Sequence, residues 1–441
     1  MLGIKQEQGP DQPDRRWIGP APWIETPAPG PKAKLAIQQR ALIAGAGSQP
    51  RYPLAVKRGF GTVIEDVDGN RFLDFAAGCA VGASGHSHPK VVAAIEAQSR
   101  ALIHACEGNY VFPPGVELME KLLTLAPGER LDRVHLNGSR SAAVQTALRL
   151  AAGASTQNRV IVLYDAMCEG IGARSTCGWL APGSPDFADA PDLHVEYIRY
   201  EQLQDLEMRL ASRRSSDPDD IAAVCIDPTQ SLWGVEESEP AMLARLRKTC
   251  DEHAVYLICD ETRSAVGQTG KWFACEHFGV VPDLIIASGG LAGGMPLAAI
   301  IGPDSVLNTL QRTNPVSDCP SPVSCAAALA TLEVVEAGYM KNTVRLGQLL
   351  LARLREVSAK RKAIANVRGV GLACGVDVVS RGTGKIDAKR YERILQACFE
   401  RGLILSGGGV GRIRFCPPLC INEAQLDVGL KIFDESVATV L

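Results

Sequence analysis

The chain has 441 residues, of which 46% are hydrophobic and 22% charged, as is typical of a globular protein. Its formal net charge is −3, so no overall positive field would attract nucleic acid or an anionic membrane surface. The longest apolar stretches, such as Leu297–Gly302, fall far short of the ~20 residues that span a bilayer. The first residues lack the basic-then-apolar order of a signal peptide. We therefore expect a cytoplasmic protein without a nucleic-acid or membrane partner.

The 14 cysteines are scattered along the chain, and no two of them have the CxxC spacing of a zinc or redox motif. Several lie inside apolar runs, for example Cys225 in AAVCID and Cys259 in VYLICD. Such cysteines behave as small buried hydrophobic residues. The pattern predicts free thiols in a reducing compartment and no metal site.

The N-terminal part of the chain divides into two segments. Residues 1–30 are rich in proline, glycine and charge, which predicts an extended arm, on which Trp17 and Trp23 dock against the rest of the protein. Residues 31–75 are assigned to a small domain, because Tyr52–Phe75 alternates like a strand pair around a turn at Asp68-Gly69. A helix is predicted to begin at Pro89.

Residues 76–330 are predicted to form a large α/β domain. Short apolar runs alternate there with helical patterns, which favours a mostly parallel sheet covered by helices. The runs are Val160–Leu163, Ala222–Ile226, Val255–Cys259, Leu284–Ala287 and Leu297–Ile301. From Ala326 a long helical pattern extends to Val357 and is followed by short strands over 366–378. Residues 331–441 are therefore assigned to a second, small α+β domain.

Polar residues follow the predicted strands of the large domain. Asp227 follows AAVCI, Asp260 and Glu261 follow VYLIC, and Ser288 follows LIIA. In a parallel α/β sheet, ligands bind beyond the carboxyl ends of the strands. Acids at successive strand ends therefore predict a cleft with a functional site.

Several blocks of the sequence resemble one enzyme family. They include GTVIEDVDGNRFLDFAAG, GHSHPKVVAAI, CDETRSAVGQTGKWFACEHFGVVPDLI, LAGGMPLAA and IRFCPPL. In this order they resemble the class III aminotransferases of the ornithine and 4-aminobutyrate group, from about Gly30 to the C-terminus. The resemblance implies the pyridoxal-phosphate (PLP) transferase fold of type I and a homodimer.

The resemblance also identifies the position of the catalytic lysine. In the family, the aspartate that matches Asp260 bonds the pyridinium nitrogen of PLP and makes the ring an electron sink. The lysine lies in a PDxxxxAKxLGGGMP block, and ungapped alignment places Gly289 at that position. No lysine occurs between Lys271 and Lys341. The group that forms the Schiff base is therefore predicted to be absent.

Other positions that contact the cofactor in the family also differ. The phosphate-binding SG(S/A)EA turn matches Ser139–Ala143, where Arg140 replaces a glycine. The aromatic-His-Gly element falls in Met167–Gly170, which contains neither an aromatic residue nor histidine. Asp227 replaces a strand-end glutamate, and Arg263 replaces a glutamine.

These comparisons give a set of candidate site residues. The candidate catalytic residues are Asp260, Asp227, Glu169 and Cys168, and the candidate substrate- or anion-binding residues are Arg140, Ser139, Ser141, Arg263, Ser317 and Arg414. Ser317 matches a threonine that reaches the partner subunit's phosphate in the family, and Arg414 matches a position that binds substrate carboxylate in some members.

Arg140 and two cysteines also have simple structural interpretations. Arg140 either fills the vacated phosphate site or is a solvated residue at a helix start. Cys168 and Cys319 fall in loops expected to line the old cofactor cavity, but they are inert thiols unless a base activates them.

Three functions remain open. The first is a repurposed enzyme of this fold that uses no covalent PLP and acts on a small amino- or acyl-type anionic substrate. The second is an aminotransferase of amino acids or ω-amines that depends on PLP or pyridoxamine phosphate, either in the conventional way or with the cofactor bound noncovalently. The third is a non-catalytic pseudo-aminotransferase that acts as a partner protein.

Overall fold

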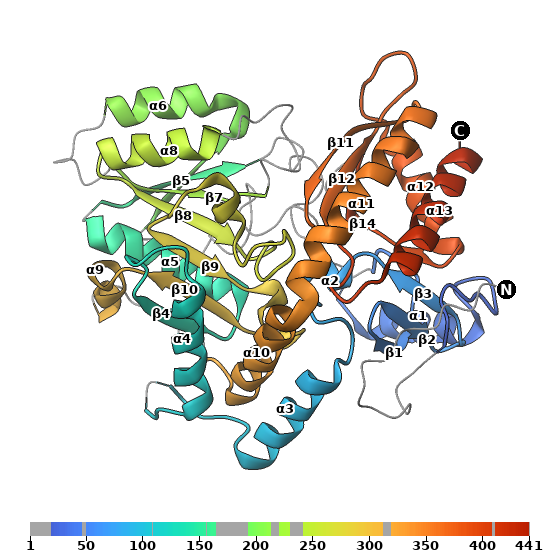
Figure 1. Ribbon diagram of the computed structural model, residues 1–441, viewed down its shortest axis with the longest axis horizontal. Coiled ribbons are helices and arrows are strands. Elements are labelled where there is room, and N and C mark those ends of the chain that lie inside the picture. Colours follow the sequence, from blue (N-terminus) through green and yellow to red (C-terminus); the bar gives the residue numbers. More distant parts are fainter. Residues whose placement is uncertain are drawn as a thin grey trace.

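The computed structural model describes residues 19–45, 50–107, 109–155, 157–164, 193–212, 220–229, 241–311, 319–407 and 411–440. In these residues a large lobe is built on a seven-stranded sheet, and a second lobe contains two four-stranded sheets (Figure 1). The N-terminal strands and the C-terminal elements lie together in the second lobe.

The seven-stranded sheet is mostly parallel, as predicted. Its order is β4 (Arg133–Asn137), β10 (Ala298–Gly302), β9 (Leu284–Ala287), β8 (Tyr256–Glu261), β7 (Ile221–Ile226), β5 (Arg159–Tyr164) and β6 (His194–Arg199). Neighbouring strands from β6 to β9 pair in parallel, whereas β10 runs antiparallel to both β9 and β4. The carboxyl ends of β7, β8 and β9 therefore meet at one edge of the sheet.

Helices cover both faces of this sheet (Figure 1). On one face, α5 (Arg140–Ser155) and α9 (Asp304–Leu307) pack over the core that contains Leu148 and Ile300. On the other face, the core includes residues of α4 (Pro113–Leu125), α6 (Leu203–Ala211), α8 (Ala241–Glu252) and α10 (Pro322–Val334). Every residue of β7 is buried, which explains why its sequence is a continuous apolar run.

The helix that leaves the large lobe is long and apolar. It comprises α10, a π-helical segment (Val335–Tyr339) and α11 (Met340–Lys360), and α10 packs against α3 (Pro89–Ala101) and α4. Residues 322–360 are long and apolar enough to cross a membrane, but 56% of the most apolar window is buried inside the protein. This helix is thus part of the core.

The N-terminal strands join a strand from the far end of the chain. β1 (Val56–Phe60), β2 (Val63–Asp66) and β3 (Arg71–Asp74) form an antiparallel meander, and β13 (Leu403–Ile404) pairs in parallel with β3. The predicted turn at Asp68-Gly69 is confirmed, with Gly69 at a φ of +95°. The backbone of Trp23 joins this sheet through a β-bridge to Arg71, whereas Trp17 lies outside the described residues.

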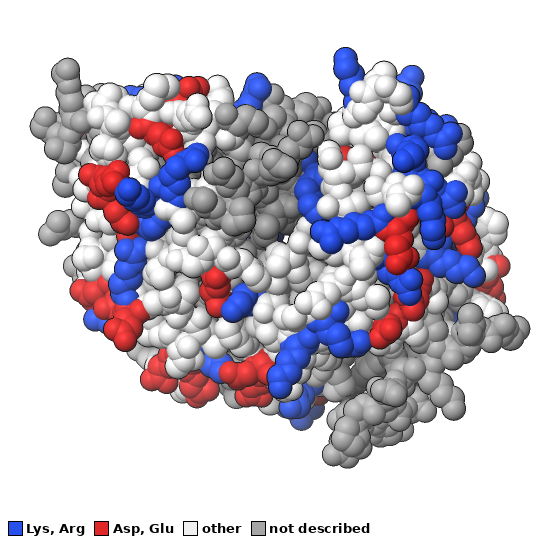
Figure 2. Space-filling view, turned by 45° about the horizontal axis from the view of Figure 1, so that its top comes forward, with Lys and Arg blue, Asp and Glu red and all other residues white. Residues whose placement is uncertain are grey.

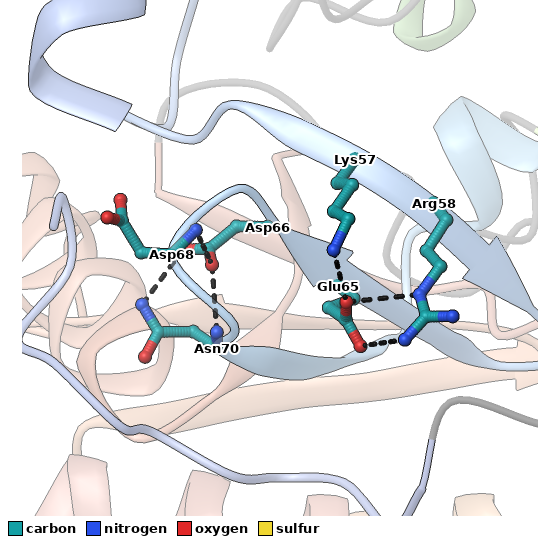
Figure 3. Close-up of polar contacts among 6 residues, drawn as sticks. All are labelled: Lys57, Arg58, Glu65, Asp66, Asp68 and Asn70. Atoms are coloured by element: carbon teal, nitrogen blue, oxygen red, sulfur yellow. Dashed lines mark hydrogen bonds and ion pairs between the residues drawn. The ribbon is translucent and has the colours of Figure 1, made fainter. Parts of the chain in front are cut away.

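The β2–β3 turn is held by polar contacts among Asp66, Asp68 and Asn70 (Figure 3), and it in turn holds the N-terminal arm. Asp66 Oδ1 accepts hydrogen bonds from the main-chain N–H groups of Asp68 and Asn70, and Asp66 Oδ2 accepts one from Asn70 Nδ2. Asn70 Oδ1 in turn accepts the N–H groups of Glu25 and Thr26 at 2.8 and 2.9 Å. The arm is therefore fixed by the turn rather than by a core of its own.

Helix α1 (Pro31–Ile43) follows the arm and begins against the same turn. The carboxylate of Asp68 accepts the N–H groups of Lys32 and Ala33 at 2.9 and 2.8 Å. A carboxylate at a helix N-terminus satisfies donors that have no partner within the helix.

The strands β1 and β2 are also linked by an ion pair. Glu65 on β2 accepts two hydrogen bonds from Arg58 on β1 (Figure 3).

The C-terminal elements form the rest of the second lobe. The sheet order is β11 (Ile364–Val370), β12 (Ala373–Val378), β15 (Arg412–Phe415) and β14 (Ser406–Gly407), and α11, α12 (Ala388–Glu400) and α13 (Glu423–Val440) share its buried core. The remaining helical segments are α2 (Ala77–Ala80), Tyr200–Gln202, Ala274–Phe278, Gly289–Ala292 and Asn308–Gln311. The domain boundaries after residues 30, 75 and 330 stay predictions.

Candidate functional site

The candidate site lies at the strand ends that the sequence indicated. Asp227 follows β7, Asp260 and Glu261 end β8, and Ser288 follows β9. Within the ladder, Ile226 pairs with Cys259 and Glu261 pairs with Ala287, so these ends are adjacent. The sheet thus brings the predicted acids to one edge, where an open α/β sheet binds its ligands.

The two aspartates are almost completely buried. Asp227 and Asp260 are 3% and 5% exposed. Asp227 Oδ1 accepts hydrogen bonds from the N–H and the hydroxyl of Thr229 at 2.8 and 2.6 Å. Asp260 Oδ1 accepts the N–H of Thr262 at 3.0 Å. Burial and the negative charge of Asp227 raise the pKa of Asp260, and the positive charge of Arg140 opposes that rise.

Arg140 connects the start of α5 with the end of β8. Its side chain is half-buried, and Nη2 donates a hydrogen bond to the main-chain carbonyl oxygen of Thr262. The guanidinium therefore extends into the protein toward the Asp260 strand end. Arg140 is accordingly not a freely solvated residue.

The turn before α5 is shaped by two neighbouring polar residues. Ser139 Oγ accepts the N–H of Ala142 at 3.3 Å and so caps the helix, while Ser141 is half-buried in the first turn. Asn137 ends β4 and is 0% exposed, and neither its Oδ1 nor its Nδ2 has a hydrogen-bond partner among the described residues. A buried amide without partners is unusual, because desolvating it costs free energy.

Gly289 lies at the start of a short 3₁₀ turn that follows β9. Its φ is +54°, in the left-handed region that favours glycine. The preceding Ser288 is buried, and its hydroxyl donates to the carbonyl oxygen of Leu297 at 2.8 Å. A Cβ on the next residue, Gly290, would lie 2.9 Å from the Cβ of Ala83. The backbone around position 289 is therefore tightly packed and shaped for glycine.

Glu261 has a different role from its neighbour Asp260. It is 0% exposed, and its two oxygens accept the N–H groups of Ala274 and Cys275 at 2.8 Å as well as the hydroxyl of Ser264. Burial raises the pKa of Glu261 to about 7. Glu261 thus holds the loop that follows β8 in place. The sequence places it beside Asp260 but does not indicate this structural role.

The other predicted site residues are distributed over two lobes. Arg263 is half-buried in the turn after β8. Arg414 lies on β15 between Gly375 of β12 and Ser406 of β14, in the second lobe. Glu169, Cys168 and Ser317 lie outside the described residues. Of the predicted site residues in the described part of the chain, Asp227, Asp260 and Arg140 are the ones that the structure brings together.

Two further contacts at this edge were not predicted. Tyr200, 27 residues before Asp227 in the chain, donates from its hydroxyl to the Asp227 carbonyl oxygen at 2.8 Å. Thr262 provides the carbonyl that Arg140 binds. No local sequence pattern marks either contact. Among the described residues, no group of three or more His, Cys, Asp or Glu residues could hold a metal ion.

Comparison with solved structures identifies the fold class. The acetylornithine aminotransferase from Elizabethkingia anophelis superposes with a TM-score of 0.76 and 26% sequence identity over 92% of this chain and 99% of that one. A transaminase from a marine Virgibacillus gives a TM-score of 0.79 at 21% identity, over 92% and 99% of the two chains. The fold is therefore the PLP-transferase fold of type I, as the sequence predicted.

Comparison with known sequences identifies the family. The profile described as aminotransferase class III matches residues 44–437. The 5-aminovalerate aminotransferase of Pseudomonas aeruginosa is 33% identical over 91% of this chain and 97% of that protein. An alanine/serine racemase of Pyrococcus horikoshii is 31% identical over 95% and 93% of the two chains. This chain belongs to the class III aminotransferase family.

Proposed function

We propose that this chain is an enzyme of the class III aminotransferase family that has lost the Schiff-base lysine and works without covalently bound PLP. Its substrate would be a small anionic amino- or acyl-type molecule in the former cofactor cleft. The main observation in support of this proposal is that the Arg140 side chain extends from the start of α5 and binds the carbonyl oxygen of Thr262, beside the buried pair Asp227 and Asp260.

The residues at the strand ends fit PLP poorly. Gly289 stands where the family has its lysine and has no side chain to form an imine. Arg140 stands at a glycine position of the phosphate turn, and its guanidinium extends to the strand end whose aspartate bonds the pyridinium nitrogen in the family. The Arg140 guanidinium would thus take up space that the cofactor needs, and its positive charge would compete with the pyridinium nitrogen for the carboxylate of Asp260. We therefore assign no step to PLP.

The proposed chemistry uses the chain's own groups. Asp260 has a raised pKa, so its carboxyl can hold a proton and transfer it to or from a substrate at the strand ends. Arg140 supplies a positive charge that favours an anionic substrate group. Asn137, with unused hydrogen-bonding capacity beside the α5 turn, would bind a polar substrate atom. The remaining anion-binding candidates are Ser139, Ser141, Arg263, Ser317 and Arg414, and the remaining catalytic candidates are Glu169 and Cys168.

The charge distribution supports an anionic substrate. Residues 331–441 contain 17 Lys and Arg against 11 Asp and Glu, although the whole chain has a net charge of −3. On the right of Figure 2, over the second lobe, basic side chains lie with acidic side chains interspersed among them. A local excess of positive charge raises the concentration of anions near the surface.

The alternative function is noncovalent binding of PLP or pyridoxamine phosphate by an aminotransferase. It is favoured by the retained Asp260 and by the relatives, which include 4-aminobutyrate and 5-aminovalerate aminotransferases. A non-catalytic partner protein is the third function, and it predicts no turnover with any substrate. We also propose a cytoplasmic location, as the sequence predicts. We propose a homodimer because the family resemblance implies one and because the end of α1 exposes Leu42 and Ile43 by 86% and 88%, which a second copy would cover.

Spectroscopy of the purified protein distinguishes these functions. The protein is expected to be colourless, to form no aldimine absorbance with added PLP, and to give no borohydride-reduced pyridoxyl adduct in tryptic peptides from the cleft. A stoichiometric reducible adduct would contradict the proposal. Thermal-shift titration with small carboxylates then tests substrate binding, and the expected stabilisation is lost in Arg140→Gln but retained in the exposed control Lys248→Gln.

A further inference from the structure

Two cysteines that are far apart in the sequence lie side by side in the fold. The Sγ atoms of Cys106 and Cys319 are 3.8 Å apart, although 213 residues separate them along the chain. Cys106 lies in the segment after α3, and Cys319 lies just before α10. Both side chains are half-buried and therefore partly accessible to a small reagent.

Most of the other cysteines of the described chain are buried and less suited to thiol chemistry. Cys225, Cys250 and Cys398 are buried, and burial raises the pKa of each thiol. Cys259 and Cys275 form a hydrogen-bonded pair, but both are 0% exposed. Because the thiolate is the reactive form, these thiols are expected to be inert. The pair of Cys106 and Cys319 combines proximity with access.

The backbone near this pair already joins the two segments. Ser321 Oγ donates a hydrogen bond to the carbonyl oxygen of Ile103 at 3.0 Å, and Ser321 Oγ also accepts the N–H of Val323 at the start of α10 at 3.2 Å. Neither cysteine lies in a helix or strand. Bringing the sulfurs from 3.8 Å to a bonded distance of ~2.0 Å requires a small movement of loop residues.

We propose that Cys106 and Cys319 form a reversible disulfide that fastens the segment after α3 to the start of α10. The oxidant is a low-molecular-weight disulfide such as oxidised glutathione. The thiolate of one cysteine attacks a sulfur of the small disulfide, forms a mixed disulfide and releases one small thiol. The second cysteine then attacks the mixed disulfide, the protein disulfide forms, and a second small thiol leaves with the other proton. Two cysteines lose two electrons, and one small disulfide gains them.

Cys319 was predicted to lie in a loop that lines the former cofactor cavity, but neither cysteine is among the strand-end groups Asp227, Asp260 and Arg140, so the disulfide is tested separately from the proposed function. Its effect is on the chain itself: the disulfide closes a loop of 213 residues, which restricts the unfolded chain. Oxidation is therefore expected to raise the melting temperature, and excess small thiol is expected to reverse the change.

The test uses the full-length protein incubated with oxidised glutathione and then alkylated. The expected result is a peptide that joins Cys106 to Cys319, a mass lower by two hydrogens, and a higher melting temperature that reduction reverses. Cys106→Ser and Cys319→Ser should each lack the joined peptide and retain glutathione on the remaining cysteine. Cys420→Ser removes another half-buried cysteine and should behave like the unchanged protein.

Two results would overturn the proposal. One is separate glutathione adducts on Cys106 and Cys319 in the unchanged protein without the joined peptide. The other is complete alkylation of both thiols after oxidation. Because the readout is peptide mass, a variant that is less stable still gives a definite answer.

Discussion

The guanidinium of Arg140 donates a hydrogen bond to the carbonyl oxygen of Thr262, across 122 residues of sequence. This contact places a positive charge two residues beyond Asp260, whose pKa is raised by burial and by Asp227 and lowered by Arg140. One side chain thus joins the start of α5 to the end of β8.

Replacing Arg140 is expected to make stability more sensitive to pH. In Arg140→Gly the pKa of Asp260 rises further, because its favourable charge partner is lost. A carboxyl whose folded pKa is raised contributes stability below its unfolded pKa, and that contribution is lost as pH rises through the folded pKa. The melting temperature of the variant relative to the unchanged protein should therefore fall more at a pH above the folded pKa of Asp260 than at a pH near the unfolded value of ~3.9.

The double variant Arg140→Gly with Asp260→Asn is the control for this prediction. It removes the titrating carboxyl, so the additional pH dependence should disappear. If Arg140→Gly lowers the melting temperature equally at both pH values, the charge coupling between Arg140 and Asp260 is not significant.

Glu261 is expected to be essential for stability. Glu261→Ala leaves three donors without acceptors, namely the N–H groups of Ala274 and Cys275 and the hydroxyl of Ser264. Each buried donor without a partner costs roughly 1–3 kcal/mol, so we expect a loss of several kcal/mol in the free energy of unfolding. Urea unfolding measures this loss, and a change below about 0.5 kcal/mol would be that of an ordinary surface site.

The pKa of Glu261 predicts a second pH effect. Burial raises this pKa from 4.5 to about 7. The contribution of the carboxyl is therefore present below about pH 4.5 and lost as pH rises through about 7. Glu261→Gln cannot titrate, so its stability should decline less than that of the unchanged protein between these pH values. Parallel stability curves for the two proteins would exclude this contribution.

The start of α1 depends on a carboxylate from the β2–β3 turn. Asp68→Ala removes the acceptor for the N–H groups of Lys32 and Ala33 and should cost about 1 kcal/mol, as the loss of a helix cap does. Amide hydrogen exchange should accelerate over 31–43 and stay unchanged in α10. Asp68→Asn keeps one oxygen acceptor and should have a smaller effect. Unchanged exchange over 31–43 in Asp68→Ala would show that α1 is held by other contacts.

Much of the fold was predictable because local sequence patterns determine it. The apolar runs that became β5, β7, β8 and β9 are buried on both faces, and parallel pairing brings their ends to one edge. The positions of Asp227 and Asp260 followed from that rule. The reversed direction of β10 was not predicted, because a buried run such as Leu297–Ile301 has the same composition in either orientation.

Contacts between distant segments could not be predicted from the sequence. Arg140 could equally have been solvated at the helix start, and only the packing of α5 against the end of β8 shows where its side chain extends. The proximity of Cys106 and Cys319 likewise depends on how α3 and α10 pack. No spacing or composition encodes such a contact, because each residue alone is compatible with an ordinary surface loop.

The final prediction concerns reversal of the proposed lysine loss. Gly289→Lys would restore PLP binding and transamination if the lysine were the one change that matters. We expect that it will restore neither. Position 289 has a φ of +54°, and a residue with a Cβ in this region costs roughly 1–2 kcal/mol. Arg140 would still extend toward Asp260, and Met167–Gly170 offers no aromatic ring to stack on the cofactor.

The size of the effect can be bounded and measured. A stacked aromatic contact is worth about 0.5–1.5 kcal/mol beyond its buried area, and every ~1.4 kcal/mol changes affinity tenfold. Losing this contact together with the phosphate contacts should weaken PLP binding by orders of magnitude. Gly289→Lys should therefore show no aldimine in a PLP titration and no turnover of amino donors. The double variant Arg140→Gly with Gly289→Lys should bind PLP at least about tenfold more tightly than Gly289→Lys alone. Tight binding and transamination by Gly289→Lys alone would instead identify a recently disabled aminotransferase, and a repurposed site would be excluded.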